Sequence, residues 1–136
     1  MALLVISGAI AGMATALLLG RFFEQRYTEI LVILLAVIAA LYVGPTIGGA
    51  QSAFMLETSV ALLLIALSVY ALRANLLVLA AGYALHGLWD MTHGLWVRHI
   101  LPPWYAPMCV GYDLAVAACI VYEYRRRESL KTPAQV

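Results

Sequence analysis

The sequence predicts an all-α integral membrane protein, built as a bundle of five transmembrane helices. Of its 136 residues, 65% are hydrophobic and only 11% are charged, whereas soluble domains are roughly half apolar and a quarter charged. Its apolar stretches are each about twenty residues long, the length that a helix needs to cross about 30 Å of hydrocarbon. The composition excludes a soluble single-domain enzyme and a disordered chain.

Each predicted span ends where glycine, proline or charged residues interrupt the apolar sequence. The five spans are 2–20, 27–47, 53–72, 76–97 and 105–124. Their short connections predict that sequential spans pack as antiparallel neighbours. We expect Pro45 to fray or kink the end of the second span. Pro107 lies in the first turn of the fifth, where a missing N–H costs little.

The basic residues predict how the bundle is oriented. Alternating the five spans places all but one of them on one side: Arg21, Arg26, Arg73, Arg125, Arg126, Arg127 and Lys131. By the positive-inside rule that side is the cytoplasm, so the N-terminus faces out and the C-terminus faces in. We predict a multi-pass protein of the cytoplasmic (plasma) membrane, with one transmembrane domain over 1–124 and a basic cytoplasmic tail over 125–136. The net charge of +1 gives no case for a nucleic-acid partner.

Three acidic residues, Glu57, Asp90 and Asp113, lie inside apolar spans and are not explained by topology. Counted from the predicted outer helix ends, they lie about 8, 10 and 12 Å deep. Three different helices thus bring a carboxylate to one layer in the outer half of the membrane. An ionised acid at a helix centre costs about 2.5–3.5 kcal/mol on insertion scales, so a cation, a proton or another partner must offset the charge.

The fourth span adds two histidines to this layer. His86, Asp90 and His93 share one narrow stripe of the helix, at the spacing that lets one helix offer several ligands to one ion. Imidazole and carboxylate together suit Zn, Mn or Fe. We therefore predict a metal site formed by His86, Asp90, His93 and Asp113, with Glu57, Asp90 and Tyr112 as catalytic candidates.

A purely structural role for these buried residues is an alternative to the metal-site hypothesis. Buried acids also form interhelical hydrogen bonds that only hold a bundle together, and Tyr112 is as well suited to packing as to proton donation. Cys109 lies one turn from Asp113 and is either a thiolate ligand or a small buried hydrophobe. Small residues at Gly8, Gly12, Ala16 and Gly20 form a stripe for close helix contact, either within the chain or between two copies in a homo-oligomer.

Two stretches resemble a family of small uncharacterised bacterial integral membrane proteins. The first is H-G-x-W-D over 86–90, and the second is W-Y-x-P-x-C-x-x-Y-D over 104–113, with an acid on an earlier span. This resemblance supports grouping these residues but implies no known activity. A looser similarity, in gathering His and Asp from several helices, is to membrane metal hydrolases of the alkaline ceramidase and adiponectin receptor type. This chain differs from them in having five spans instead of seven.

The expected function is a metal-dependent membrane enzyme that acts on a lipid-like or apolar small molecule from the outer leaflet. In a hydrolytic version, the metal lowers the pKa of a bound water, and Asp90 or Glu57 accepts its proton. In an oxidative version, the same residues hold iron. Two alternatives stay open: ion or proton transport along the buried polar groups, and an accessory subunit in which those groups only fix helix packing.

Overall fold

The computed structural model describes residues 1–95 and 101–131, and its regular structure there is entirely helical. Five long helices cover most of these ranges: α1 (Ala2–Phe22), α2 (Tyr27–Ala40), α4 (Gln51–Ala71), α5 (Leu76–Thr92) and α6 (Tyr105–Lys131). Three single turns join or extend them: η1 (Glu24–Arg26), α3 (Val43–Thr46) and η2 (His93–Leu95). The predicted all-α class is confirmed.

Several helices are suited to a membrane. Four stretches are long and apolar enough to cross one: Ala2–Phe22, Glu24–Thr46, Gln51–Ala71 and Tyr105–Leu130. Helix α5 has 17 residues, and η2 continues its predicted span to Leu95. Residues 96–97, the last two of that span, lie outside the described residues, as do 98–100 and 132–136. Large apolar side chains cover the outside of the bundle, with Ile10 and Leu63 more than 60% exposed. This much exposed apolar surface fits a protein surrounded by lipid.

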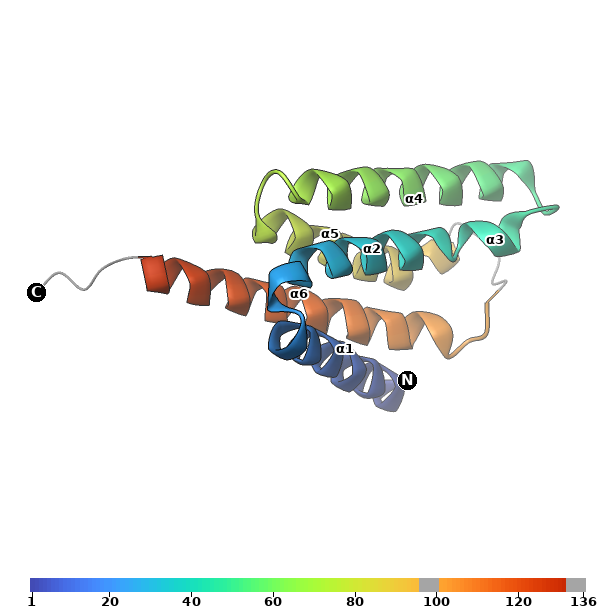
Figure 1. The fold of residues 1–136 in the computed structure, drawn as a ribbon. Helices are drawn as coiled ribbons and strands as arrows, with labels where there is room; N and C mark the ends of the chain where they lie inside the picture. The colour runs from blue at the N-terminus through green and yellow to red at the C-terminus, as the bar shows by residue number, and fades with distance from the viewer. Residues whose placement is uncertain (96–100, 132–136) are drawn as a thin grey trace, which may run out of the picture.

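The helices run up and down through one bundle (Figure 1). Helix α1 packs on α6, α6 on α5, α5 on α4, and α4 on α2, which also contacts α5. The N-terminus, the α3–α4 turn and the start of α6 therefore lie at one end of the bundle. The opposite end carries η1, the α4–α5 turn and the extended end of α6.

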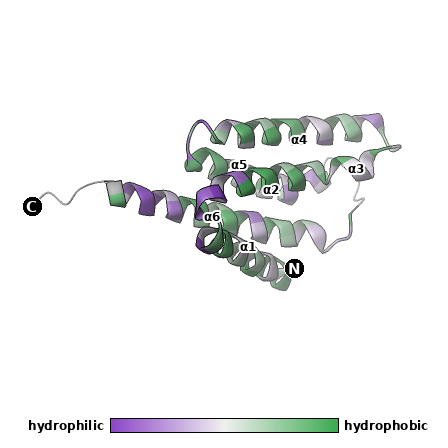
Figure 2. Cartoon of the chain, in the orientation of Figure 1, coloured by the Kyte–Doolittle hydropathy of each residue, from purple (hydrophilic) through white to green (hydrophobic). Residues whose placement is uncertain are grey.

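Charged residues gather at that opposite end, where Figure 2 shows hydrophilic residues on η1 and the last turns of α6. Glu123 pairs there with Arg126 at 2.9 Å and with Arg127 at 2.7 Å. Helix α6 continues in helical form to Lys131, past the predicted end of its span at residue 124. The first part of the predicted tail is therefore helix with charged side chains.

Local sequence explains where α2 and α5 end and begin. The Asn75 side chain caps α5 by accepting hydrogen bonds from the backbone N–H groups of Leu77 and Val78, as expected for an N-cap asparagine. Helix α2 ends at Ala40, five residues before Pro45. Because proline lacks an N–H and crowds the carbonyl four residues earlier, it interrupts the helix there. The break leaves Tyr42 between α2 and α3.

The apolar core lies in the half of the bundle nearer the charged end. Leu31 and Leu35 of α2, Leu79 of α5, and Val116 and Ile120 of α6 are fully buried there. Polar side chains instead collect in the other half, where Glu57, His86, Asp90, His93 and Asp113 are all less than 8% exposed. The bundle is thus divided into an apolar half and a half with a polar interior.

The small-residue stripe of α1 packs within the chain, against α6. A β-carbon built on Gly8 would overlap the carbonyl oxygen of Met108, and one on Gly12 would overlap that of Tyr112. From the other side, a β-carbon on Gly111 would overlap the carbonyl oxygen of Val5. Of the two roles left open by the sequence, the structure places this stripe in intrachain helix contact.

Tyr83 links α5 to α2 inside the apolar core. Its side chain is fully buried, and its hydroxyl donates a hydrogen bond of 2.8 Å to the backbone carbonyl of Leu31. We expect Tyr83→Phe to lower the free energy of unfolding by about 0.5–1.5 kcal/mol, because it removes this bond and leaves the ring in place. Unfolding in mixed detergent micelles would measure the change. Tyr70→Phe is the control because Tyr70 is 60% exposed, and an equal loss there would contradict the prediction.

Candidate metal centre

Three buried side chains from two helices meet in the polar half of the bundle. His86 and Asp90 lie one turn apart on α5, and Asp113 faces them from α6. Each offers one ligand atom, and the three atoms lie within 4.8 Å of one another. All three residues are at most 4% exposed. This group could hold a metal ion.

The distances within the group can be compared with those of a metal site. His86 Nδ1 is 3.4 Å from Asp90 Oδ2 and 2.7 Å from Asp113 Oδ2. Two ligands held about 2.1 Å from one tetrahedral ion lie roughly 3.4 Å apart. The His86–Asp90 distance therefore already fits a shared ion, whereas the shorter distance is that of a hydrogen bond. A shift of about 0.7 Å in Asp113 would bring its oxygen to the spacing of a ligand.

The group also leaves hydrogen-bonding capacity unused. Over residues 1–95 and 101–131, Asp113 Oδ1 has no hydrogen-bond partner. The Asp90 carboxylate lacks a short hydrogen bond: His86 Nδ1 lies 3.4 Å from its Oδ2, and the Tyr42 hydroxyl faces it. Buried polar atoms are rarely left in this state, because an unmade hydrogen bond costs about 1–3 kcal/mol and more for a charged group. A cation between the carboxylates would use these oxygens and offset their repulsion.

A glycine on α5 lets α6 approach this group. A β-carbon built on Gly87 would lie 3.3 Å from the β-carbon of Asp113 and 3.8 Å from the carbonyl oxygen of Val110. The contact is tight enough that an alanine there would require Asp113 to shift by a few tenths of an ångström. The glycine of the H-G-x-W-D stretch therefore allows α6 to lie close to α5 beside His86 and Asp113.

Glu57 lies outside the group of three. Its carboxylate is 2% exposed and accepts a hydrogen bond of 3.1 Å from the indole N–H of Trp89. Its other oxygen, Oε1, has no hydrogen-bond partner within the described part of the chain. The structure thus brings Glu57 of α4 to the same layer as Asp90 but holds it on a neighbouring face of α5.

His93 follows the end of α5 in the turn η2. Its Nδ1 lies 3.2 Å from the backbone carbonyl oxygen of Asp90. Its ring packs edge-on against Tyr42, with 4.7 Å between ring centroids. His93 is buried beside the group but is not one of the three residues whose ligand atoms cluster.

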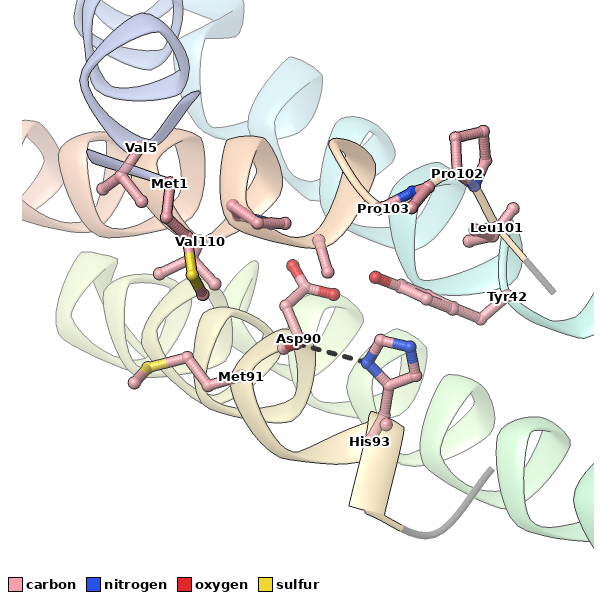
Figure 3. A pocket seen from close by; sticks show the side chains of 13 residues that line it. Met1, Val5, Tyr42, Asp90, Met91, His93, Leu101, Pro102, Pro103 and Val110 are labelled. Atoms are coloured by element: carbon pink, nitrogen blue, oxygen red, sulfur yellow. Dashed lines mark hydrogen bonds between the residues drawn. The ribbon is translucent and has the colours of Figure 1, made fainter. Parts of the chain in front are cut away.

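Asp90 and His93 line an apolar pocket of about 410 Å³, which we call the Asp90 pocket. Figure 3 shows the Asp90 carboxylate and the Tyr42 hydroxyl turned toward each other across it, with Met1, Val5, Met91 and Val110 on the other side of Asp90. The pocket lies within the usual size range of small-molecule sites, about 300–1,000 Å³. An apolar cavity with a few convergent polar groups is the typical form of such a site.

Tyr112 faces a different, smaller cavity of about 160 Å³, the Asp113 pocket. Cys109 and Asp113 line it together with residues of α1, among them Gly8 and Ala11. The predicted catalytic candidate Tyr112 is therefore next to the group of three on its α1 side, whereas Asp90 faces the Asp90 pocket.

Tyr42 is the residue of this site that the sequence analysis did not identify. It is 4% exposed, and its hydroxyl faces the Asp90 carboxylate. Its ring contacts Tyr105 as well as His93. One feature of the sequence could have identified it: Tyr42 lies three residues before Pro45. The helix break caused by this proline turns the chain toward the interior of the bundle, at the depth of the acidic residues.

A family model covers nearly the whole chain. It is described as a family of unknown function, DUF6010, and it matches residues 3–126. The chain belongs to the DUF6010 family. No curated protein and no solved structure matches the sequence significantly. The DUF6010 match confirms that the chain belongs to an uncharacterised family, and it brings no activity with it.

In this DUF6010 protein, the Trp89–Glu57 bond gives a test of the polar layer. We expect Trp89→Phe to lower the free energy of unfolding by about 1–3 kcal/mol, because Glu57 loses its hydrogen-bond donor while staying buried. Detergent unfolding would measure the loss. Trp104→Phe is the control, since Trp104 is 48% exposed. An unchanged stability of Trp89→Phe would show that this bond contributes little.

Proposed function

We propose that the protein is a metal-dependent membrane enzyme that acts on a lipid-like or apolar small molecule, with hydrolysis as the preferred reaction. His86, Asp90 and Asp113 hold one divalent ion, Zn, Mn or Fe. The observation that carries the proposal is the buried group of three, whose Asp90 carboxylate also lines the Asp90 pocket. In a metal site that borders an apolar cavity, a water on the metal would lie next to an apolar substrate bound in the cavity.

The residues around the pocket suit a hydrolytic step. A divalent ion held by His86, Asp90 and Asp113 would supply a water of lowered pKa for attack on the carbon of an ester or amide. The second oxygen of Asp90 would accept the proton of that water and return it to the leaving group as the carbon–heteroatom bond breaks. The Tyr42 hydroxyl, which faces Asp90, is placed to hydrogen-bond the substrate oxygen during this step.

The apolar core favours an enzyme over a transport path. Side chains such as Leu35, Leu79 and Ile120 fill the half of the bundle between the polar layer and the charged end. A path for ions or protons needs polar groups or water along its length. Tyr83 and Ser68 bury hydroxyls in this half, but each donates to a backbone carbonyl and is surrounded by apolar side chains. The site accordingly opens to one side of the membrane.

We assign that side to the outer leaflet. The end with Arg126 and Arg127 carries the excess of basic residues and is placed in the cytoplasm by the positive-inside rule. The N-terminus and the metal centre then lie toward the outside of the plasma membrane. Labelling of single cysteines at Gln51 and Ser129 with a membrane-impermeant maleimide, in a Cys109→Ala, Cys119→Ala background, tests this orientation: only the first should react in intact cells.

Elemental analysis of the purified protein tests the proposed function directly. We expect Zn, Mn or Fe at about one ion per chain after purification without added chelator. A preparation that contains no such metal, and takes none up on incubation with each ion, would overturn the proposal. It would leave the buried acids as interhelical hydrogen-bonding groups.

A further inference from the structure

We infer that the Asp90 pocket binds a single-chain amphiphile that enters sideways from the membrane, with its uncharged polar end at Asp90 and Tyr42 and its hydrocarbon chain between α1 and α5. This inference rests on the proposed function for its chemistry but concerns the substrate and its route. Three observations carry it: the polarity of the two ends of the pocket, its opening toward lipid, and the absence of lysine and arginine from the described residues that line it.

The two ends of the pocket differ in chemistry. One end presents the Asp90 carboxylate and the Tyr42 hydroxyl, which are both buried and face each other. The other end is formed by Met1, Val5 and Val110, from α1, its N-terminus and α6. A ligand that satisfies both ends carries a hydrogen-bonding group on one side and hydrocarbon on the other.

The apolar end lies toward the lipid. Met91 lines the pocket and is 66% exposed, and its neighbour on the outer face of α5, Leu88, is 53% exposed. Helix α1 packs chiefly on α6, so α1 and α5 flank α6 and leave its first turns between them. Leu101, Pro102 and Pro103 lie across the pocket near the end of the bundle. A hydrocarbon chain in the bilayer therefore reaches the pocket past Met91 without crossing water.

The polar end selects the kind of headgroup. Lysine and arginine are absent from the described residues that line the pocket. An anionic headgroup would meet the Asp90 carboxylate there, and a divalent ion held by two carboxylates leaves no excess positive charge to attract it. A hydroxyl or amide can instead donate to the carboxylate and accept from the Tyr42 hydroxyl. The substrate class is therefore a neutral single-chain lipid.

Photolabelling in phosphatidylcholine nanodiscs tests this inference on the full chain. The probe is dodecyl alcohol that carries a mid-chain diazirine and an alkyne handle, and labelled residues are identified by mass spectrometry. We expect labels at Met1, Val5, Met91 or Val110, and labelling at these positions about tenfold weaker with dodecanoate carrying the same groups. Label spread evenly over outward-facing positions such as Leu63, or equal labelling by alcohol and carboxylate, would overturn the inference.

Three variants locate the access route and the polar end. Met91→Trp should reduce pocket labelling about tenfold by covering the opening, whereas Leu88→Trp, one turn away on the same exposed face, should leave it unchanged. Tyr42→Phe should remove the preference for the alcohol over the corresponding diazirine-bearing dodecane. Equal effects of the two tryptophans would overturn the sideways route, and an unchanged preference in Tyr42→Phe would overturn the assigned polar end.

Metal content measured on the same samples separates this inference from the proposed function. Pocket labelling with metal present supports both. Metal without pocket labelling overturns the substrate class and leaves the metal enzyme standing. Pocket labelling without metal overturns the proposed chemistry and supports the binding site.

Discussion

His86→Ala and Asp113→Asn are each expected to remove most of the bound metal. Each takes away one of only three clustered ligands, and even the loss of an outer-shell partner typically costs about 10–100-fold in metal affinity. Elemental analysis of the purified variants, followed by titration with the metal found in the unsubstituted protein, would measure the change. Asp113→Asn keeps the size and buried position of the side chain, so its loss of metal cannot be attributed to a cavity.

His93→Ala is the informative comparison for these two variants. The spacing on the fourth span predicts His93 as a ligand, but the cluster of ligand atoms consists of His86, Asp90 and Asp113. If the ion is held by this cluster, His93→Ala should keep its metal within a few-fold of the unsubstituted protein. Loss of metal from His93→Ala equal to that from His86→Ala would restore the four-residue ligand set.

Stability provides a second readout that does not depend on turnover. An ion that binds only the folded protein stabilises it by about 2.7 kcal/mol when its free concentration is one hundred times the Kd. A chelator should therefore lower the unfolding midpoint of the unsubstituted protein and leave that of Asp113→Asn unchanged. Equal responses of the two proteins would show that the chelator acts elsewhere.

The fold and the layer of the site follow from the sequence because lipid imposes simple constraints. Apolar segments of membrane-spanning length must be helices, and their ends coincide with charged, glycine or proline residues such as Arg21 and Pro45. An acid inside such a segment must face the interior of the bundle. That argument alone brings Asp90 and Asp113 together, and the structure has their ligand atoms within 4.8 Å of each other and of His86.

The detailed contacts between side chains cannot be predicted from the sequence. A helix that is apolar on all sides carries no pattern that shows which side faces which neighbouring helix. Glu57 has the right depth, but the rotation of α4 directs it to Trp89 and not into the group of three. Tyr42 reaches the site through the break before Pro45, whose direction no periodicity encodes. The partner of the α1 glycines likewise depends on tertiary structure, since the stripe fits a contact with α6 and a contact with a second copy equally well.

The contact between α1 and α6 leads to the second large expected effect. Gly111→Ala should separate the two helices, because the new β-carbon would overlap the carbonyl oxygen of Val5, which belongs to helix backbone and cannot move aside alone. Overpacking of a close contact typically costs about 1–3 kcal/mol, and we expect about 3 kcal/mol here because the obstacle is backbone. Gly8→Ala should behave in the same way, since its β-carbon would overlap the carbonyl oxygen of Met108.

Gly44→Ala is the matched control, because a β-carbon at Gly44 meets no atom within 4 Å among the described residues. Unfolding in detergent should show a large loss for Gly111→Ala and almost none for Gly44→Ala, and equal losses would refute the close contact. The same substitution should also reach the Asp90 pocket, because α1 contributes Val5 to its apolar end. With α1 displaced, labelling by the dodecyl alcohol probe should weaken while the metal, held by α5 and α6 alone, stays bound.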